Sequence, residues 1–108
     1  MTAPKAPAHL RDDGRRLWRR IVCEFELQAH HLAVLCAACD ALDRQTEARR
    51  AIDTDGAYLP GRFGTKAHPA LAVERDARLA MVRCLRELGL DFTTPAAPPR
   101  APSPHHER

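Results

Sequence analysis

One segment, residues 58–90, constrains the fold more than any other part of the chain. A glycine-containing loop ends at His68-Pro69, and an amphipathic segment follows that ends at Gly89. Proline suits the start of a helix because the first turn does not use its missing N–H. Glycine suits the position just past a helix because it adopts the left-handed conformation without steric cost. We therefore predict a helix of about twenty residues between Pro69 and Gly89, roughly 30 Å long.

The apolar arc of this helix is unusually wide. At 100° per residue, one arc of the helix carries nearly all of its apolar side chains: Leu71, Val73, Ala77, Ala80, Met81, Val82, Cys84, Leu85 and Leu88. A single neighbouring helix cannot cover an arc of this width. In a chain of 108 residues, we expect the second neighbour to come from another subunit, which predicts a homo-oligomer.

Two further helices precede this segment. The first is predicted from near Arg11–Asp13 to Phe25, with opposite apolar and arginine faces, and the second from about Ala29 to Asp53. The short link between them makes them antiparallel neighbours. The polar second half of the second helix is expected to reach solvent or another subunit. In the loop that follows, Pro60-Gly61 predicts a type II turn. Tyr58-Leu59 and Arg62-Phe63 flank this turn, and they form a tiny hairpin or remain loop.

The whole chain is predicted to be all-α, with three main helices: a helix pair and a long C-terminal helix. Aromatic residues make up only 5%, too few to build a sheet of any size. Residues 1–10 are interpreted as a flexible N-terminal arm, and residues 1–8 as unable to bury anything. Residues 11–92 form the helical domain, and the proline-dense residues 93–108 a disordered tail.

Several classes of function are disfavoured by the sequence. No apolar run approaches the roughly twenty residues of a membrane span, and the N-terminus lacks the apolar core of a signal peptide. We interpret the chain as a cytoplasmic protein with its four cysteines reduced. Cys36 and Cys39 lie inside a helical apolar stripe, which favours core residues over a metal or redox site. His68 is interpreted as a helix-entry residue that bonds the loop backbone. The sequence therefore predicts no catalytic residue, cofactor or metal.

The positive charge is concentrated at the N-terminus. The net charge is +3, and residues 1–22 alone hold six cations and two acids. Such an asymmetry suggests a polyanionic partner, although most charged helix faces are merely solvated. Arginine forks match phosphate oxygens, so we predict a DNA-binding set on and before the first helix. Its members are Arg15, Arg16, Arg19 and Arg20, with Lys5 and Arg11 as flexible helpers.

Over about residues 6–90, the chain resembles the small terminase subunit of tailed phages and prophages. The resemblance is carried by the following motifs in their order: Ala6-Pro7-Ala8-His9-Leu10, Gly14-Arg15-Arg16-Leu17-Trp18 with Val22, then Leu32, Leu35 and Cys39, then Gly64, Lys66, His68-Pro69-Ala70-Leu71, Arg75 and Leu88-Gly89-Leu90. It implies a small helical protein that forms a ring, binds double-stranded viral DNA and hands it to the large terminase subunit. The large subunit holds the ATPase and nuclease, so the resemblance implies no enzymatic activity for this chain, and it places the chain in the bacterial host cytoplasm.

Two residues depart from the family pattern. Arg11 stands where similar proteins place a Ser or Thr helix cap, and His30-His31 replaces an acidic cap at the second helix. Two other functions stay open from the residues alone. One is a standalone helix-turn-helix DNA-binding regulator, for which Ala29, His30 and His31 are poor base readers. The other is a structural adaptor without DNA contact.

Overall fold

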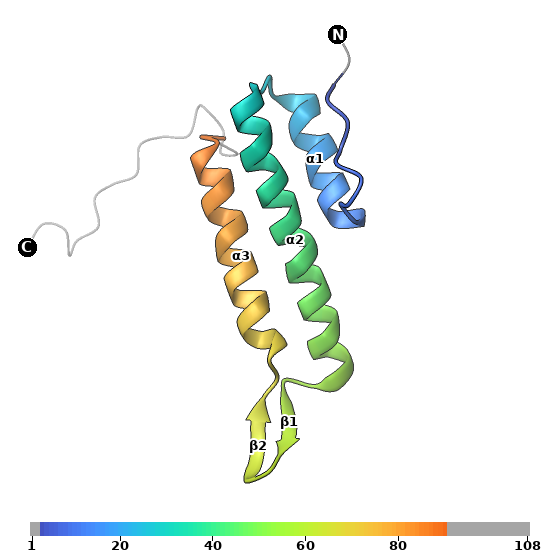
Figure 1. Cartoon of the computed structure of the whole chain (residues 1–108), viewed down its shortest axis with the longest axis vertical. Coiled ribbons are helices and arrows are strands. Elements are labelled where there is room, and N and C mark those ends of the chain that lie inside the picture. Colours follow the sequence, from blue (N-terminus) through green and yellow to red (C-terminus); the bar gives the residue numbers. More distant parts are fainter. Residues whose placement is uncertain (1–2, 91–108) are drawn as a thin grey trace, which may run out of the picture.

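Within residues 3–90, which the computed structural model describes, the fold consists of three helices and one β-hairpin. The elements are α1 (Asp12–Glu24), α2 (Ala29–Asp55), β1 (Tyr58–Gly61), β2 (Gly64–Ala67) and α3 (Ala70–Glu87). α1 and α3 pack on different sides of α2, and the hairpin projects past the end of the α2–α3 pair (Figure 1). The prediction of an essentially all-α chain with three helices is confirmed. The end of the helical domain at residue 92 and the predicted disordered tail, residues 93–108, lie outside the described residues.

α1 divides into an apolar and a basic face, as its sequence predicted. Trp18 and Ile21 are buried on the side that faces α2. Acidic Asp12 and Asp13 occupy the first turn, where carboxylates interact favourably with the positive end of the helix dipole. The boundaries of α1 agree with the prediction to within one residue. The apolar and basic residues of this segment fall on opposite sides of a helix, and this pattern is typical of no other element.

α2 begins with a capping box in which a histidine takes the usual acidic role. The Gln28 side chain accepts a hydrogen bond from the backbone at the third helical position, His31. In return, Gln28 N–H donates to Nδ1 of His31 at 3.3 Å. The ring nitrogen accepts a hydrogen bond here, as a carboxylate oxygen does in the common capping box. The departure from the family pattern at His31 therefore keeps the function of the cap.

The second half of α2 packs against α3, although its polar sequence predicted contact with solvent or another subunit. It packs along the first half of α3, where the small residues Ala48 and Ala77 are buried. At the same contact, Gln45 Nε2 donates a hydrogen bond to Glu74 Oε2 at 3.0 Å. The expectation that this half projects into solvent or meets another subunit is corrected for the side that faces α3. Small side chains let the two helices approach closely, so this side needs no large apolar residue.

The hairpin forms, but its turn lies two residues later than predicted. Gly61 pairs with Gly64, so Arg62 and Phe63 form the turn and Pro60 belongs to β1. Gly64 has φ of 117°, and a Cβ on Gly61 would lie 2.7 Å from the Gly64 carbonyl oxygen. Both positions that flank the turn thus require glycine. Pro60 is tolerated because both strands of an isolated hairpin are edge strands.

α3 starts and ends at the predicted signals. Pro69 immediately precedes it, and Gly89 follows with φ of 69°. His68 secures the entry: its Nδ1 accepts a hydrogen bond from Ala70 N–H at 2.9 Å, and its Nε2 lies 2.9 Å from Asp55 Oδ2. The interpretation of His68 as a helix-entry residue is confirmed. Neither this helix nor α1 or α2 is long and apolar enough to cross a membrane.

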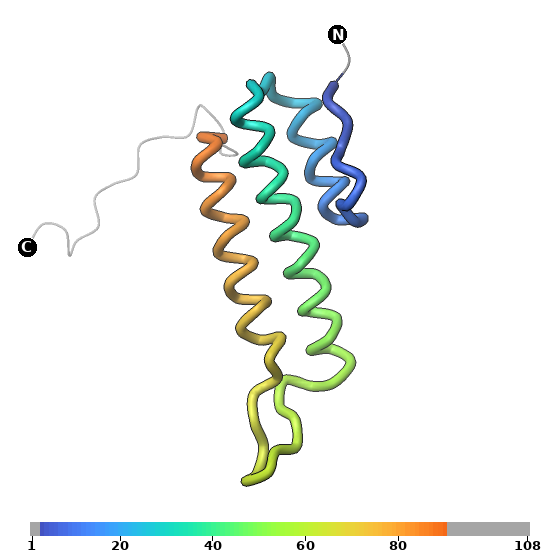
Figure 2. Tube along the Cα trace, viewed as in Figure 1, coloured from blue at the N-terminus to red at the C-terminus, as the bar shows by residue number. Residues whose placement is uncertain are grey.

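The main core lies between α1 and α2 and includes the N-terminal segment. Leu10 is buried there, and Ala6 packs against it. Trp18 Nε1–H donates to the Pro4 carbonyl oxygen at 3.0 Å, which holds the segment along α1 (Figure 2). These contacts correct the expectation that residues 1–8 bury nothing. The reason is tertiary, because a buried indole needs an acceptor and the extended backbone supplies one.

Candidate nucleic-acid interface

The arginines predicted to bind DNA do not all lie in the same environment. Arg16, Arg19 and Arg20 are exposed on α1, on the side opposite Trp18 and Ile21. Their exposure follows from the burial of the apolar face, since residues four apart share a face and the two faces are half a turn apart. These three side chains form what we call the arginine face.

Ion pairs within α1 hold part of this face. Arg16 NH1 lies 2.9 Å from Asp13 Oδ1, and Arg20 Nε lies 3.7 Å from Glu24 Oε1. Both pairs are exposed, so each is weak and a phosphate can replace the carboxylate at little cost. Within residues 3–90, Arg19 has no hydrogen bond or ion pair. Arg16 and Arg20 are thus each paired with an acid at one end of the same helix.

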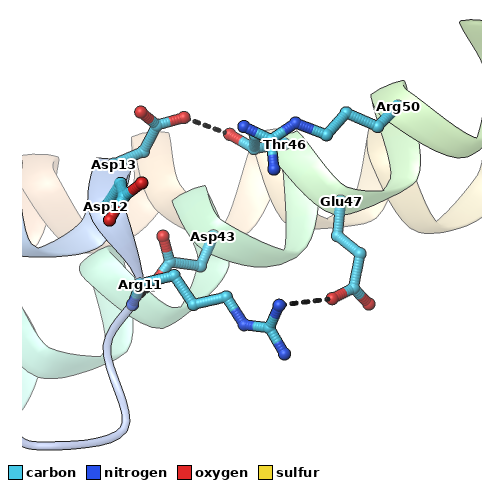
Figure 3. Close-up of a pocket in the computed structure, with 7 residues that line it drawn as sticks. All are labelled: Arg11, Asp12, Asp13, Asp43, Thr46, Glu47 and Arg50. Carbon is cyan, nitrogen blue, oxygen red and sulfur yellow. Dashed lines mark hydrogen bonds and ion pairs between the residues drawn. The ribbon is translucent and has the colours of Figure 1, made fainter.

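Arg15 and Arg11 are held differently. Arg15 is half-buried, and its NH2 group donates to the Ala8 carbonyl oxygen at 2.7 Å, so this arginine fastens the N-terminal segment to α1. Arg11 reaches toward α2, where its NH1 lies 3.7 Å from Glu47 Oε2 (Figure 3). Lys5, the remaining predicted residue, is exposed. The structure thus brings Arg16, Arg19 and Arg20 together and separates Arg11 from them.

An acidic groove lies beside the arginine face, between the start of α1 and the middle of α2. Its volume is about 380 Å³. Four acids and two cations line it together with Thr46 (Figure 3): Asp12, Asp13, Asp43, Glu47, Arg11 and Arg50. Because acids outnumber cations here, this side of α1 repels a polyanion.

Asp43 in this groove performs a task that the sequence did not reveal. Its Oδ2 accepts a hydrogen bond from Arg11 N–H at 2.6 Å, and its Oδ1 accepts one from Gly14 N–H at 2.7 Å. Arg11 is the residue immediately before α1, and Gly14 lies in its first turn; the helix has no capping side chain of its own. A carboxylate on α2 therefore caps α1, and this explains why Arg11 can occupy the cap position that similar proteins give to Ser or Thr.

Asp13 links the arginine face to α2. The Thr46 hydroxyl donates a hydrogen bond to Asp13 Oδ2 at 2.7 Å. This bond lowers the pKa of Asp13 below its ordinary value; partial burial opposes the effect, and Arg16 adds to it. The carboxylate therefore stays ionised at neutral pH, where it holds the Thr46 hydroxyl and pairs weakly with the exposed Arg16. Through these contacts, α2 sets the position of the α1 surface.

The cysteines divide into core and surface positions. Cys39 is fully buried, and burial raises the pKa of its thiol to about 12, so it stays protonated. Cys36 is half-buried, and its Sγ lies 3.9 Å from Asp40 Oδ2, while His9 Nε2 lies 2.6 Å from Asp40 Oδ1. The ligand atoms of His9, Cys36 and Asp40 all fall within 4.8 Å of one another, which is compatible with a metal ion. The simpler role of the His9–Asp40 contact is to hold the N-terminal segment on α2. That the chain binds no metal stays a prediction.

Comparison with known proteins gives one match. The family model of the phage terminase small subunit matches residues 14–101 of the chain, which is well over half of its length. No curated protein and no solved structure gives a significant match.

Proposed function

The chain belongs to the phage terminase small subunit family, and on this premise we propose that it binds double-stranded viral DNA as an oligomeric ring and recruits the large terminase subunit for genome packaging. A packaging role follows from the family; the finer steps are our proposal. Such a protein acts in the cytoplasm of the bacterial host, and the large subunit supplies the enzymatic activity.

The observation that carries the DNA contact is the arginine face. Arg16, Arg19 and Arg20 point outward from a helix whose other side is locked into the core. Planar guanidinium groups bind phosphate in a bidentate manner. No polar base-reading set accompanies them on α1, so we expect contacts to the DNA backbone rather than to base edges.

Uncovered apolar side chains on α3 support the oligomer. Val73 and Val82 belong to the predicted apolar arc, and each is 42% exposed, as expected for an arc wider than α2 can cover. Leu79, which lies on the polar side of α3, is 49% exposed. Burying them against a second copy would remove this surface from water. In a ring, the arginine face repeats around a circle, and weak contacts from several subunits add through effective concentration.

The decisive experiment replaces two arginines. In the Arg16→Gln/Arg20→Gln variant, affinity for viral DNA should fall, and the slope of log K against log salt should flatten by about 0.9 for each lost phosphate contact. Helicity and oligomer size should not change, since both side chains are exposed. Binding is measured by fluorescence anisotropy over a series of salt concentrations.

A matched control is available on α3. Arg75 and Arg78 are also exposed and paired with acids, so Arg75→Gln/Arg78→Gln removes the same charge from another helix. It should bind DNA with nearly the wild-type slope. If both double variants lose affinity equally, general charge rather than the arginine face drives binding. If neither does, the DNA surface lies elsewhere or the chain is a structural adaptor. A light-scattering measurement that finds a stable monomer on dilution would refute the ring.

A further inference from the structure

The β-hairpin between α2 and α3 is a second surface with a distinct chemistry. It projects past the ends of both helices, and its two-residue turn, Arg62-Phe63, is its most distant point (Figures 1 and 2). Nothing in the helical core requires it, because its side chains do not belong to the core cluster. A protruding element that contributes nothing to the core is free to serve a contact.

The turn presents an aromatic ring and positive charge together. Phe63 is 95% exposed, and the guanidinium carbon of Arg62 lies 5.5 Å from the centre of its ring. This stacking keeps the cation beside the ring and stiffens the tip. Lys66 on β2 adds a second cation. The sequence holds no acid between Asp55 and Glu74, so neither charge is offset within the hairpin.

An exposed phenylalanine is common at protein–protein contacts, but its surroundings here favour a different partner. The hairpin carries two cations, Arg62 and Lys66, and no acid, and a cationic surface attracts a polyanion such as DNA. An aromatic wedge flanked by Arg and Lys is the chemistry that architectural proteins use in the DNA minor groove. The cations contact phosphates, and the ring fits between unstacked base pairs.

We propose that the hairpin tip enters the minor groove of double-stranded DNA, where Phe63 inserts between neighbouring base pairs and Arg62 and Lys66 contact the flanking phosphates. This inference rests on the proposed function, because it adds a second contact to the same DNA. Only the two-residue turn needs to enter the groove, which is about 6 Å wide before it opens. Insertion of the ring bends the duplex, so the protein would present bent DNA for packaging.

Bending distinguishes insertion from simple electrostatic attachment. The test measures energy transfer between dyes at the two ends of a short viral duplex, with the full-length protein. Wild-type protein should bend the duplex by about 20–90°, the range seen for wedge residues. Phe63→Ala should abolish the bend and weaken binding about tenfold, the scale of one lost aromatic–base stack. Phe63→Leu, which keeps an apolar wedge, should restore much of the bend.

Two controls separate the role of the wedge from that of charge. Tyr58 is also exposed, at 68%, but it pairs with Ala67 at the base of the hairpin, so Tyr58→Ala should bend DNA as wild type does. Arg62→Gln/Lys66→Gln should flatten the salt dependence by about 0.9 per lost contact.

The outcomes that overturn the proposal are specific. If Phe63→Ala binds and bends DNA as wild type does, the tip does not insert. If it loses binding to the large subunit instead, the hairpin is a protein-docking element. If the wild-type protein binds no DNA at all, the proposed function fails together with this inference, whereas unbent but bound wild-type DNA overturns the inference alone.

Discussion

Removing the carboxylate of Asp43 should destabilise the fold by uncapping α1. In Asp43→Ala, Arg11 N–H and Gly14 N–H lose their acceptor, which they now hold at 2.6 and 2.7 Å. The first group is exposed and can bond water instead. The second is partly buried, so its loss approaches the roughly 1.5–3 kcal/mol of a hydrogen bond to a charged group. With a small addition from the helix dipole, we expect a loss of about 2–3 kcal/mol in the free energy of unfolding.

This loss is large for a chain of this size. At about 4–8 °C per kcal/mol for a small domain, Tm should fall by roughly 8–24 °C. Urea and thermal unfolding followed by far-ultraviolet circular dichroism would measure it, at a fixed protein concentration because oligomers gain stability by mass action. Asp53→Ala is the matched control, since Asp53 is an exposed acid on the same helix.

The reasoning is refuted if Asp43→Ala unfolds within about 0.5 kcal/mol of the control, the range of ordinary surface substitutions. Such a result would mean that water replaces the carboxylate at both N–H groups. It would also remove the structural reason why Arg11 can stand at the start of α1.

Three further predictions test the same region and the core. Gly14→Ala should destabilise by about 1–3 kcal/mol in thermal melts, because its Cβ would collide with Asp43 Oδ2 and lie 2.9 Å from the Cys39 carbonyl oxygen on α2. Stability equal to wild type would show that the helices can separate at no cost. Thr46→Val should destabilise near neutral pH and lose this effect in acid. The folded protein lowers the pKa of Asp13 from its ordinary value of 3.8, so the bond stabilises the fold at pH values above 3.8. This stabilisation disappears as the pH falls through the pKa of Asp13 in the folded protein. A difference in unfolding free energy that persists at about pH 2 would therefore contradict the Thr46–Asp13 bond. Iodoacetamide should label exposed Cys23 in the native protein and Cys39 only after unfolding, since burial raises the pKa of the Cys39 thiol to about 12; mass spectrometry that finds equal rates would place Cys39 outside the core.

The helices could be predicted because their signals are local. Apolar spacing along α1 and the Pro69 and Gly89 signals of α3 depend only on residues within a few positions. The hairpin turn was misplaced for a local reason as well: Pro60-Gly61 is a good turn pair, but the close approach at Gly61 and the positive φ of Gly64 move the turn to the next two residues. Residues 60–61 and residues 62–63 are both acceptable turns. The pairing register of the two strands decides between them, and the sequence of a single strand does not specify that register.

The sequence by itself determined the three helices, the wide apolar arc of α3, and the outward direction of Arg16, Arg19 and Arg20, since periodicity alone fixes which side of a helix faces inward. Only the tertiary structure decided what surrounds them. Asp43 caps α1 from 29 and 32 positions away, and Thr46 binds Asp13 from 33 positions away. No sequence pattern connects such partners, because they meet only when α1 packs on α2 and places unsatisfied N–H groups against a neighbouring carboxylate.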